Sequence, residues 1–296
     1  MNISKASKDP RMIKALTGSS YQEFTNLLPS FEKALIEIKK ENKDRKRGIG
    51  GGQKGHLKTT ADKLFFILLY IKTYPTFDLL SFLSDKGRGR SCEAVHFYLR
   101  VLKKALGHEL VLPERKIHSI EEFERLFPEV KDVFLDGTER RIQRPKKKKN
   151  QNKQYSGKKK THTRKNVIMA DENKKVLFLS KTKSGKRHDK KIYDKSILKI
   201  PENVAKWADT GFQGIAKFLE NVVMPKKGTK KNPLTKEEKE SNRIISSFRV
   251  VIEHTIGGVK RFRVLTDVLR NRIGIFDDLA MEVGCGMWNY HLRHTR

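Results

Sequence analysis

The chain has 296 residues and a formal net charge of +31, since 65 lysines and arginines face only 34 aspartates and glutamates. No stretch reaches the roughly 20 apolar residues of a membrane-spanning helix, and two cysteines are too few for a disulfide scaffold or a cysteine-based zinc site. The length favours two domains, and the charge favours nucleic acid as the partner, because neutralised phosphates release counterions. A lysine-rich genome is the alternative source of the charge.

The first 125 residues carry helical periodicity. Apolar residues recur every three or four positions from Phe24 to Ile38, and a second apolar helix is predicted from Ala61 to about residue 74, where Pro75 stops it. Residues 42–58 between them form a Gly-rich basic connector. This connector lacks the Gly-Lys-Ser/Thr of a phosphate-binding P-loop.

Two further helices are predicted at residues 77–85 and 92–106, with Thr76 and Ser91 as their N-caps. The Gly-containing turn between them and the arginines before the second helix have the form of a helix-turn-helix, whose second helix would enter the major groove of DNA. Any small helical bundle would give the same pattern, so both interpretations stay open.

A basic segment covers residues 140–165 without one acidic residue. It lies in mid-chain between two apolar runs, where a disordered tail is not expected. We interpret it as a loop that is attached to a sheet and positioned to bind phosphates. The alternative is a solvated loop that binds no partner.

In the second half of the chain, the pattern predicts strands first and then alternating strands and helices. This order indicates a mixed sheet with helices packed on it, which is a fold of the α+β or α/β class. The predicted elements are a strand at 133–135, a hairpin with NVIMA and KVLFLS as its strands, a loop and helix with Asp189 as a cap, a strand at 204–208 and a short run NVVMP. Alternatively, His188 and Asp189 lie next to the ligands of a metal site.

Asp136 and Asp209 each stand at the end of an apolar strand and are followed by a glycine within two residues. A third acid, Glu253, lies on a helix predicted over residues 242–262, on the face opposite to its apolar stripe. Turn-forming aspartates and an exposed, ion-paired helix face would explain these positions without a site. Alternatively, the three carboxylates converge as ligands of two Mg²⁺ ions, with Mn²⁺ as a substitute, for an in-line phosphodiester displacement.

Seven sequence blocks resemble DDE transposases of bacterial insertion sequences, particularly the insertion sequence family five type. TYPTFDLL and GRGRSCEAVHFYL are similar to the helix-turn-helix of that family, and five later blocks are similar to its catalytic domain in the same order: FLDGTERRIQRP, YSGKKKTHTRKN, GKRHDK, WADTGFQG and RVVIEHTIGGVKRF. The resemblance implies a ribonuclease-H-like fold with Asp136 on the first strand, Asp209 on the fourth and Glu253 on a later helix.

The resemblance also implies a division into an N-terminal segment and linker (1–58), a helix-turn-helix domain (59–125) and a catalytic domain (126–296). Its expected activity is binding of the element's terminal inverted repeats, followed by Mg²⁺-dependent strand cleavage and strand transfer. The expected partners are double-stranded DNA, both element ends and target, and a second copy of the chain in a dimer or higher assembly. We expect a bacterial cytoplasmic protein that associates with the nucleoid and has no membrane contact.

The residues expected to contact DNA are basic or polar and lie in the segments just described. They are Arg90, Ser91, His96, Arg140, Arg141, Lys146, Lys147, Lys148, Lys149, Lys158, Lys159, Lys160, His162, Arg249 and Lys260.

One position departs from the family. Related transposases carry a tyrosine, arginine, glutamate and lysine along the last helix; here Ser246 replaces the tyrosine, while Arg249, Glu253 and Lys260 match the rest. Two other functions remain open, a domesticated metal-dependent endonuclease without strand transfer and a helix-turn-helix DNA-binding regulator. A basic ribosome-associated protein is a more remote alternative.

Overall fold

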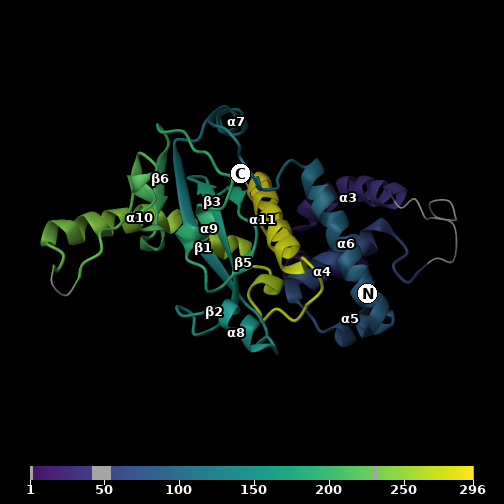
Figure 1. Ribbon diagram of the computed structural model, residues 1–296. Helices are drawn as coiled ribbons and strands as arrows, with labels where there is room; N and C mark the ends of the chain where they lie inside the picture. The colour runs from purple at the N-terminus through teal and green to yellow at the C-terminus, as the bar shows by residue number, and fades with distance from the viewer. Residues whose placement is uncertain (1–2, 42–54, 230–231, 296) are drawn as a thin grey trace. The chain divides into compact units, whose positions relative to one another are not determined.

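The computed structural model describes residues 3–41, 55–229 and 232–295, and its chain divides into two compact units (Figure 1). The first unit takes residues 1–112 and 259–296 from the two ends of the chain, and the second is Pro113–Gly258. Residues 42–54 of the predicted basic connector lie outside the described part.

The first unit is helical. Its elements are α1 (Ile3–Ser7), α2 (Pro10–Thr17), α3 (Tyr21–Glu41), α4 (Thr60–Thr73), α5 (Phe77–Ser84), α6 (Arg88–His108), the 3₁₀ turn η3 (Arg263–Leu265) and α11 (Phe276–Thr295). The long helix α6 packs against α3, α4, α5 and α11, and its inward side chains, such as Leu99 and Leu102, are fully buried.

The apolar helix α4 begins and ends where its sequence dictates. Thr59 and Asp62 form a reciprocal capping box at its start, and Tyr74 closes its end in the left-handed conformation (φ 46°) just before Pro75. None of the described helices is both long enough and apolar enough to cross a membrane.

The pair α5 and α6 is joined by three residues, which is a shorter turn than the predicted loop over residues 86–90. Thr76 accepts a hydrogen bond from the Leu79 amide and begins α5, which confirms that cap. The predicted cap at Ser91 is wrong: α6 begins three residues earlier, at Arg88, because the segment expected to be a loop continues the helix. Ser91 is instead fully buried within the first turns of α6.

The second unit is built on a mixed sheet. Its strands are β1 (Asp132–Arg141), β2 (Tyr155–Ser156), β3 (Thr161–Asp171), β4 (Val176–Leu179), β5 (Lys183–Ser184), β6 (Ala205–Ala208) and β7 (Val222–Val223). The order is β2-β3-β1-β6-β7, and β4 and β5 also pair with β3. The predicted hairpin is confirmed as the antiparallel pair β3 and β4, whereas β1, β6 and β7 run parallel to one another.

Helices flank this sheet and complete the unit. They are α7 (Ile120–Leu126), α8 (Lys148–Gln154), α9 (Asp189–Tyr193), the 3₁₀ turns η1 (Thr210–Phe212) and η2 (Ile215–Lys217), and α10 (Lys236–Val259). The core joins apolar side chains of β1, β3 and β6 to those of α7, α9, η1 and η2. The predicted fold class is confirmed: a helical N-terminal region precedes a mixed sheet with flanking helices, consistent with a ribonuclease-H-like fold.

Candidate active site

Two aspartates lie next to each other where the pairing of β1 with β6 ends. In the parallel pair of β1 and β6, Leu135 lies opposite Ala208, so that Asp136 and Asp209 are the next residues on strands that run side by side. Adjacent strands in a sheet are about 5 Å apart. Each aspartate accepts a hydrogen bond from the backbone amide that follows it, from Gly137 and Thr210 respectively, both at 2.7 Å. Asp209 directly follows β6, but the predicted strand end at Asp136 is wrong, because β1 continues through its pairing with β3 as far as Arg141. The point where the β1–β6 pairing ends, called the strand ends below, therefore brings together two carboxylates that are 73 residues apart.

The Asp136 carboxyl group has a perturbed pKa. Burial, with a smaller contribution from the nearby negative charges of Asp209 and Asp189, raises this pKa to about 6 against the opposing effects of the Gly137 amide and the Arg249 guanidinium. Asp136 is thus held in a position where its ionised form costs free energy. A carboxyl group with such a perturbed pKa is a common feature of functional sites.

Helix α10 contributes a cation and a third acid. Arg249 Nη1 lies 3.7 Å from Asp209 Oδ1, and the Arg249 side chain is only 11% exposed. Glu253 follows four residues later on the same helix, so it shares the face of Arg249, one turn nearer the C-terminal end. The Glu253 side chain is exposed. The predicted assignment of a buried apolar face and an exposed polar face to this helix is partly wrong. Arg249 faces inward, while Ile244 and Phe248 of the apolar stripe are each 52% exposed.

An aromatic stack connects the three elements that carry these acids. The rings of Phe134 on β1 and Trp207 on β6 are stacked with centroids 6.0 Å apart, and Trp207 stacks in turn on Phe248 of α10 at 5.0 Å. The Trp207 indole also donates to Asp132 Oδ1 at 2.6 Å. Phe134 and Trp207 lie two residues before Asp136 and Asp209, and Phe248 directly precedes Arg249. The stack therefore fixes α10 against the strand ends.

A second charged group, which the sequence did not reveal, lies beside Asp136. Lys165 Nζ lies 3.2 Å from Glu139 Oε1 and 3.3 Å from Asp189 Oδ1. Lys165 and Glu139 are directly opposite each other in the antiparallel pair β1 and β3. This cross-strand pairing of opposite charges could have been found from the sequence only if the strand register had been known.

The structure does not assemble three carboxylates into a metal cage. Across residues 3–41, 55–229 and 232–295, no three histidine, cysteine, aspartate or glutamate side chains are grouped so that they could hold a metal ion. Asp136 and Asp209 form a pair, and Glu253 lies on the helix that contacts Asp209 through Arg249. The site of three metal ligands stays a prediction.

Comparisons with known proteins identify the family of the chain. The family model described as DDE superfamily endonuclease matches residues 135–289, which is more than half of the chain and includes all three acids. The chain belongs to this family. It is also 28% identical, over 293 residues that make up 99% of both chains, to a protein of Microchaete diplosiphon named "Probable transposase for insertion sequence element IS702". No solved structure matches the chain significantly.

In this DDE superfamily member, most of the predicted DNA contacts of the basic segment are exposed. Arg141 ends β1, Lys146 and Lys147 precede α8, Lys148 and Lys149 begin it, and Lys158, Lys159 and Lys160 form the turn between β2 and β3; all are exposed. The expected loop thus contains a short helix and a two-stranded turn. His162 is half-buried in β3, edge-to-face with Tyr155.

Three other predicted contacts are buried or half-buried, and the expected exposure of Arg140 and Ser91 is wrong. Arg140 is 2% exposed and donates to Asn166 Oδ1 at 2.8 Å within the sheet unit. Ser91 is fully buried, and His96 is half-buried, with its Nε2 2.9 Å from the Asn271 amide. Burial and the charge of Arg100 lower the pKa of His96.

The remaining two predicted contacts outside α10 differ in position. Arg90 is exposed on the first turn of α6, and half-buried Lys260 follows the last residue of α10.

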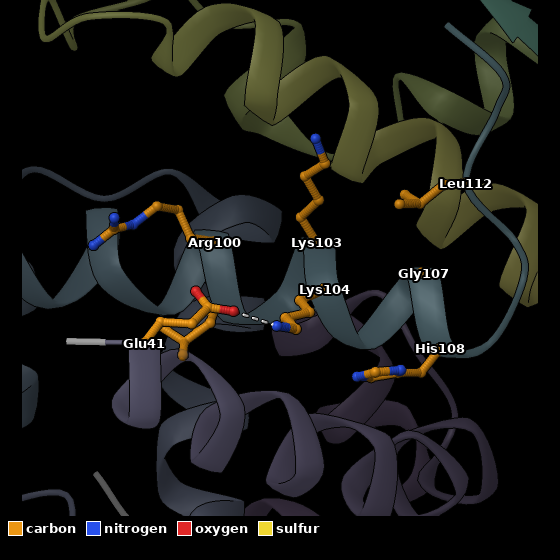
Figure 2. Close-up of a pocket in the computed structure, with 8 residues that line it drawn as sticks. Glu41, Arg100, Lys103, Lys104, Gly107, His108 and Leu112 are labelled. Carbon is orange, nitrogen blue, oxygen red and sulfur yellow. Dashed lines mark hydrogen bonds and ion pairs between the residues drawn. The ribbon is translucent and has the colours of Figure 1, made fainter. Parts of the chain in front are cut away.

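A separate hollow of about 480 Å³ lies entirely within the helical unit, between α3 and α6 (Figure 2). Its lining is charged, but Lys104 faces Glu41 at 2.6 Å and Glu37 at 3.2 Å, and His108 Nε2 lies 3.0 Å from Glu37. Because these charges pair with one another, the hollow is less suited to a charged ligand than the strand ends of the sheet unit.

Proposed function

We propose that this chain is a transposase of an insertion sequence, which binds the ends of its element and uses divalent cations to cleave them and join them to target DNA. The observation that carries the proposal is the pairing of Asp136 and Asp209 at adjacent strand ends, next to the helix of Arg249 and Glu253. The proposal is supported by the Microchaete diplosiphon relative, which is named a probable transposase and aligns with nearly the whole of this chain.

The donor set suits Mg²⁺. Around the strand ends, four carboxylates (Asp136, Asp209, Asp189 and Glu139) face three cations (Lys165, Lys158 and Arg249), so that acids outnumber cations there in an otherwise strongly basic protein. Carboxylate oxygens are the ligands that Mg²⁺ prefers, and Mn²⁺ accepts the same ligands. Asp136, Asp209 and Glu253 would hold two such ions. The ions would supply Lewis-acid activation of the attacking oxygen and of the leaving oxygen.

The side chains of the protein would orient the reacting phosphate. In the first reaction, water attacks a phosphodiester at the element end, the bond to the 3′-oxygen breaks and a 3′-hydroxyl is released. In the second, this hydroxyl attacks a phosphodiester of the target, so that a new bond forms as another breaks and no covalent bond to the protein is needed. Arg249 and Lys260 would neutralise charge on the phosphate during both displacements.

Recognition of DNA would be divided between two regions. The exposed lysines around α8 and the β2–β3 turn would bind phosphates without reading sequence. The helix α6, with Arg90 on its first turn, would read bases of the inverted repeats in the major groove. Joining two element ends calls for a dimer or higher assembly, which would act on the nucleoid of a bacterial cytoplasm.

The proposal is tested with Asp136→Asn, Asp209→Asn and Glu253→Gln in the full chain, assayed for Mg²⁺-dependent nicking of DNA that carries the element ends. We expect each substitution to lower the rate by roughly 1,000-fold, since metal-bound transition-state charge is no longer stabilised. Asp194→Asn is the matched control, because Asp194 is an exposed carboxylate on the same sheet unit, paired with Lys190. Full activity of the Asp136 and Asp209 variants would contradict the enzyme assignment and favour a DNA-binding regulator.

Strand transfer needs its own assay. Pre-cleaved element ends with a free 3′-hydroxyl, incubated with the protein, Mg²⁺ and a target plasmid, should yield joined products. Cleavage of uncut ends without any joined product would instead identify a metal-dependent endonuclease.

A further inference from the structure

The carboxylate of Asp189 occupies the space beside two glycines that follow the paired aspartates. A Cβ atom added to Gly137 would lie only 2.2 Å from Asp189 Oδ1, and one added to Gly211 would lie 3.0 Å from Asp189 Oδ2. Gly137 directly follows Asp136, and Gly211 lies two residues after Asp209. A single carboxylate therefore contacts both strand ends, and it can do so because neither glycine has a side chain.

This carboxylate does not act as the predicted helix cap. His188 is the N-cap residue of α9, and Asp189 is the first residue of the helix. The predicted cap at Asp189 is therefore wrong. Its carboxylate lies against the two glycines and forms an ion pair with Lys165.

Lys165 fixes the carboxylate in this position. The Lys165 side chain is 8% exposed and lies between Asp189 and Glu139, whose side chains are 18% and 6% exposed. Glu139 is held in turn by the Thr163 hydroxyl, which donates to its Oε2 at 2.7 Å. Although burial raises the pKa of Glu139, hydrogen bonds from Thr163 and Ser156 and the charge of Lys165 lower it overall. The group is thus a fixed network of charges inside the sheet unit.

We propose that Asp189 is a positioning residue of the carboxylate site: held by Lys165, it separates the backbones at Gly137 and Gly211 and so sets the spacing of Asp136 and Asp209. This inference rests on the proposed function in one respect, namely that Asp136 and Asp209 are the residues that hold the divalent cation. Groups that orient metal ligands without binding the metal typically change metal affinity by 10- to 100-fold when they are removed.

The first experiment measures the affinity of the full chain for MnCl₂ by calorimetry, without DNA. We expect Asp189→Ala, which removes the spacer, and Asp189→Asn, which removes the ion pair with Lys165, to weaken Mn²⁺ binding about 10-fold. Asp194→Ala, on the residue that follows α9, should bind Mn²⁺ as the unmodified chain does. Unchanged Mn²⁺ affinity in both Asp189 variants would overturn the inference.

The second experiment tests the interaction itself by a double-mutant cycle. Gly137→Ala should lower the unfolding temperature and the Mn²⁺ affinity, because the new methyl group collides with the Asp189 carboxylate. In the Asp189→Ala background the same substitution should have little further effect, since the space is then empty. Equal effects in the two backgrounds would overturn the inference, and Gly211→Ala provides a milder version if Gly137→Ala does not fold.

Failure of the inference and failure of the proposed function give different results. If Asp136→Asn and Asp209→Asn lose Mn²⁺ binding but the Asp189 variants keep it, only the positioning role of Asp189 is wrong. If the Asp136 and Asp209 variants bind Mn²⁺ as tightly as the unmodified chain, the proposed metal site itself is wrong.

Discussion

The hollow of the helical unit and the strand ends of the sheet unit are both rich in charge, but their charges are balanced differently. In the hollow, Lys104 pairs with Glu37 and Glu41, and Lys103 pairs with Glu282 at 3.1 Å. At the strand ends, acids outnumber cations, and the pKa of Asp136 is raised to about 6 by burial and neighbouring acids.

The charged side chains of the hollow are neutralised by ion pairs within the fold, whereas the excess carboxylates at the strand ends need a cation from outside the protein. Exposed ion pairs such as those of the hollow contribute little to stability or to chemistry. Carboxylates kept together at a cost in free energy are expected where a cation or a reaction supplies the compensation. The following predictions test this distinction, from the largest expected effect to the smallest.

Of the effects predicted in this comparison, the largest is expected from removing the exposed lysines around the start of α8. Substitution of Lys146, Lys147, Lys148 and Lys149 by Gln should weaken binding of linear DNA by about 100-fold at low salt. The slope of log K against log salt should become shallower by about 0.9 for each phosphate that the variant no longer neutralises. A matched control removes four exposed lysines elsewhere in the same unit: Lys131, Lys191, Lys195 and Lys199. An equal weakening in both variants would mean that net charge, and not this segment, binds DNA.

Breaking the aromatic stack should lower cleavage less severely. Phe248→Ala should reduce the cleavage rate about 30-fold with little change in DNA affinity, because α10 no longer stacks on Trp207 and Glu253 is less well oriented. In a Trp288→Phe background, Trp207 is the remaining tryptophan, and its emission should shift to the red. Ile244→Ala is the control, since Ile244 is as exposed as Phe248 on the same helix, and Phe248→Tyr should restore the rate.

Asp136 should destabilise the metal-free protein at neutral pH. Its pKa rises from the usual 3.8 to about 6 on folding, so the folded state binds the proton more tightly, and stability falls as pH increases from about 4 through 6. Asp136→Asn should therefore raise the free energy of unfolding at pH 7.5 in EDTA by on the order of 1 to 2 kcal/mol, and this gain should shrink towards pH 4. Urea denaturation at several pH values measures it; a gain independent of pH would contradict the assigned pKa.

The smallest effect is expected in the hollow. Lys104→Met removes both ion pairs with Glu37 and Glu41, yet it should change the free energy of unfolding by less than about 1 kcal/mol and leave DNA cleavage unchanged. A large drop in cleavage in this variant would mean that the hollow has a function and that the contrast with the strand ends is wrong.

Much of the architecture could be predicted from local patterns. The end of α4 at Pro75, the cap of α5 at Thr76 and the hairpin of β3 and β4 depend on residues that are close together in the sequence. The predictions were wrong at two places. Helix α6 begins at Arg88, before the expected cap at Ser91, and Arg140 is buried in the sheet unit although it lies in a basic segment.

The sequence by itself determined the basic character of the chain, the alternation of helices and strands, and the position of Asp209 at the end of a strand, because composition and periodicity are local properties. Only the tertiary structure decided that β1 and β6 are parallel neighbours, that Arg249 and not the apolar stripe faces Asp209, and that Asp189 lies between Gly137 and Gly211. These contacts depend on strand order, register and helix rotation, which are set by packing between segments far apart along the chain.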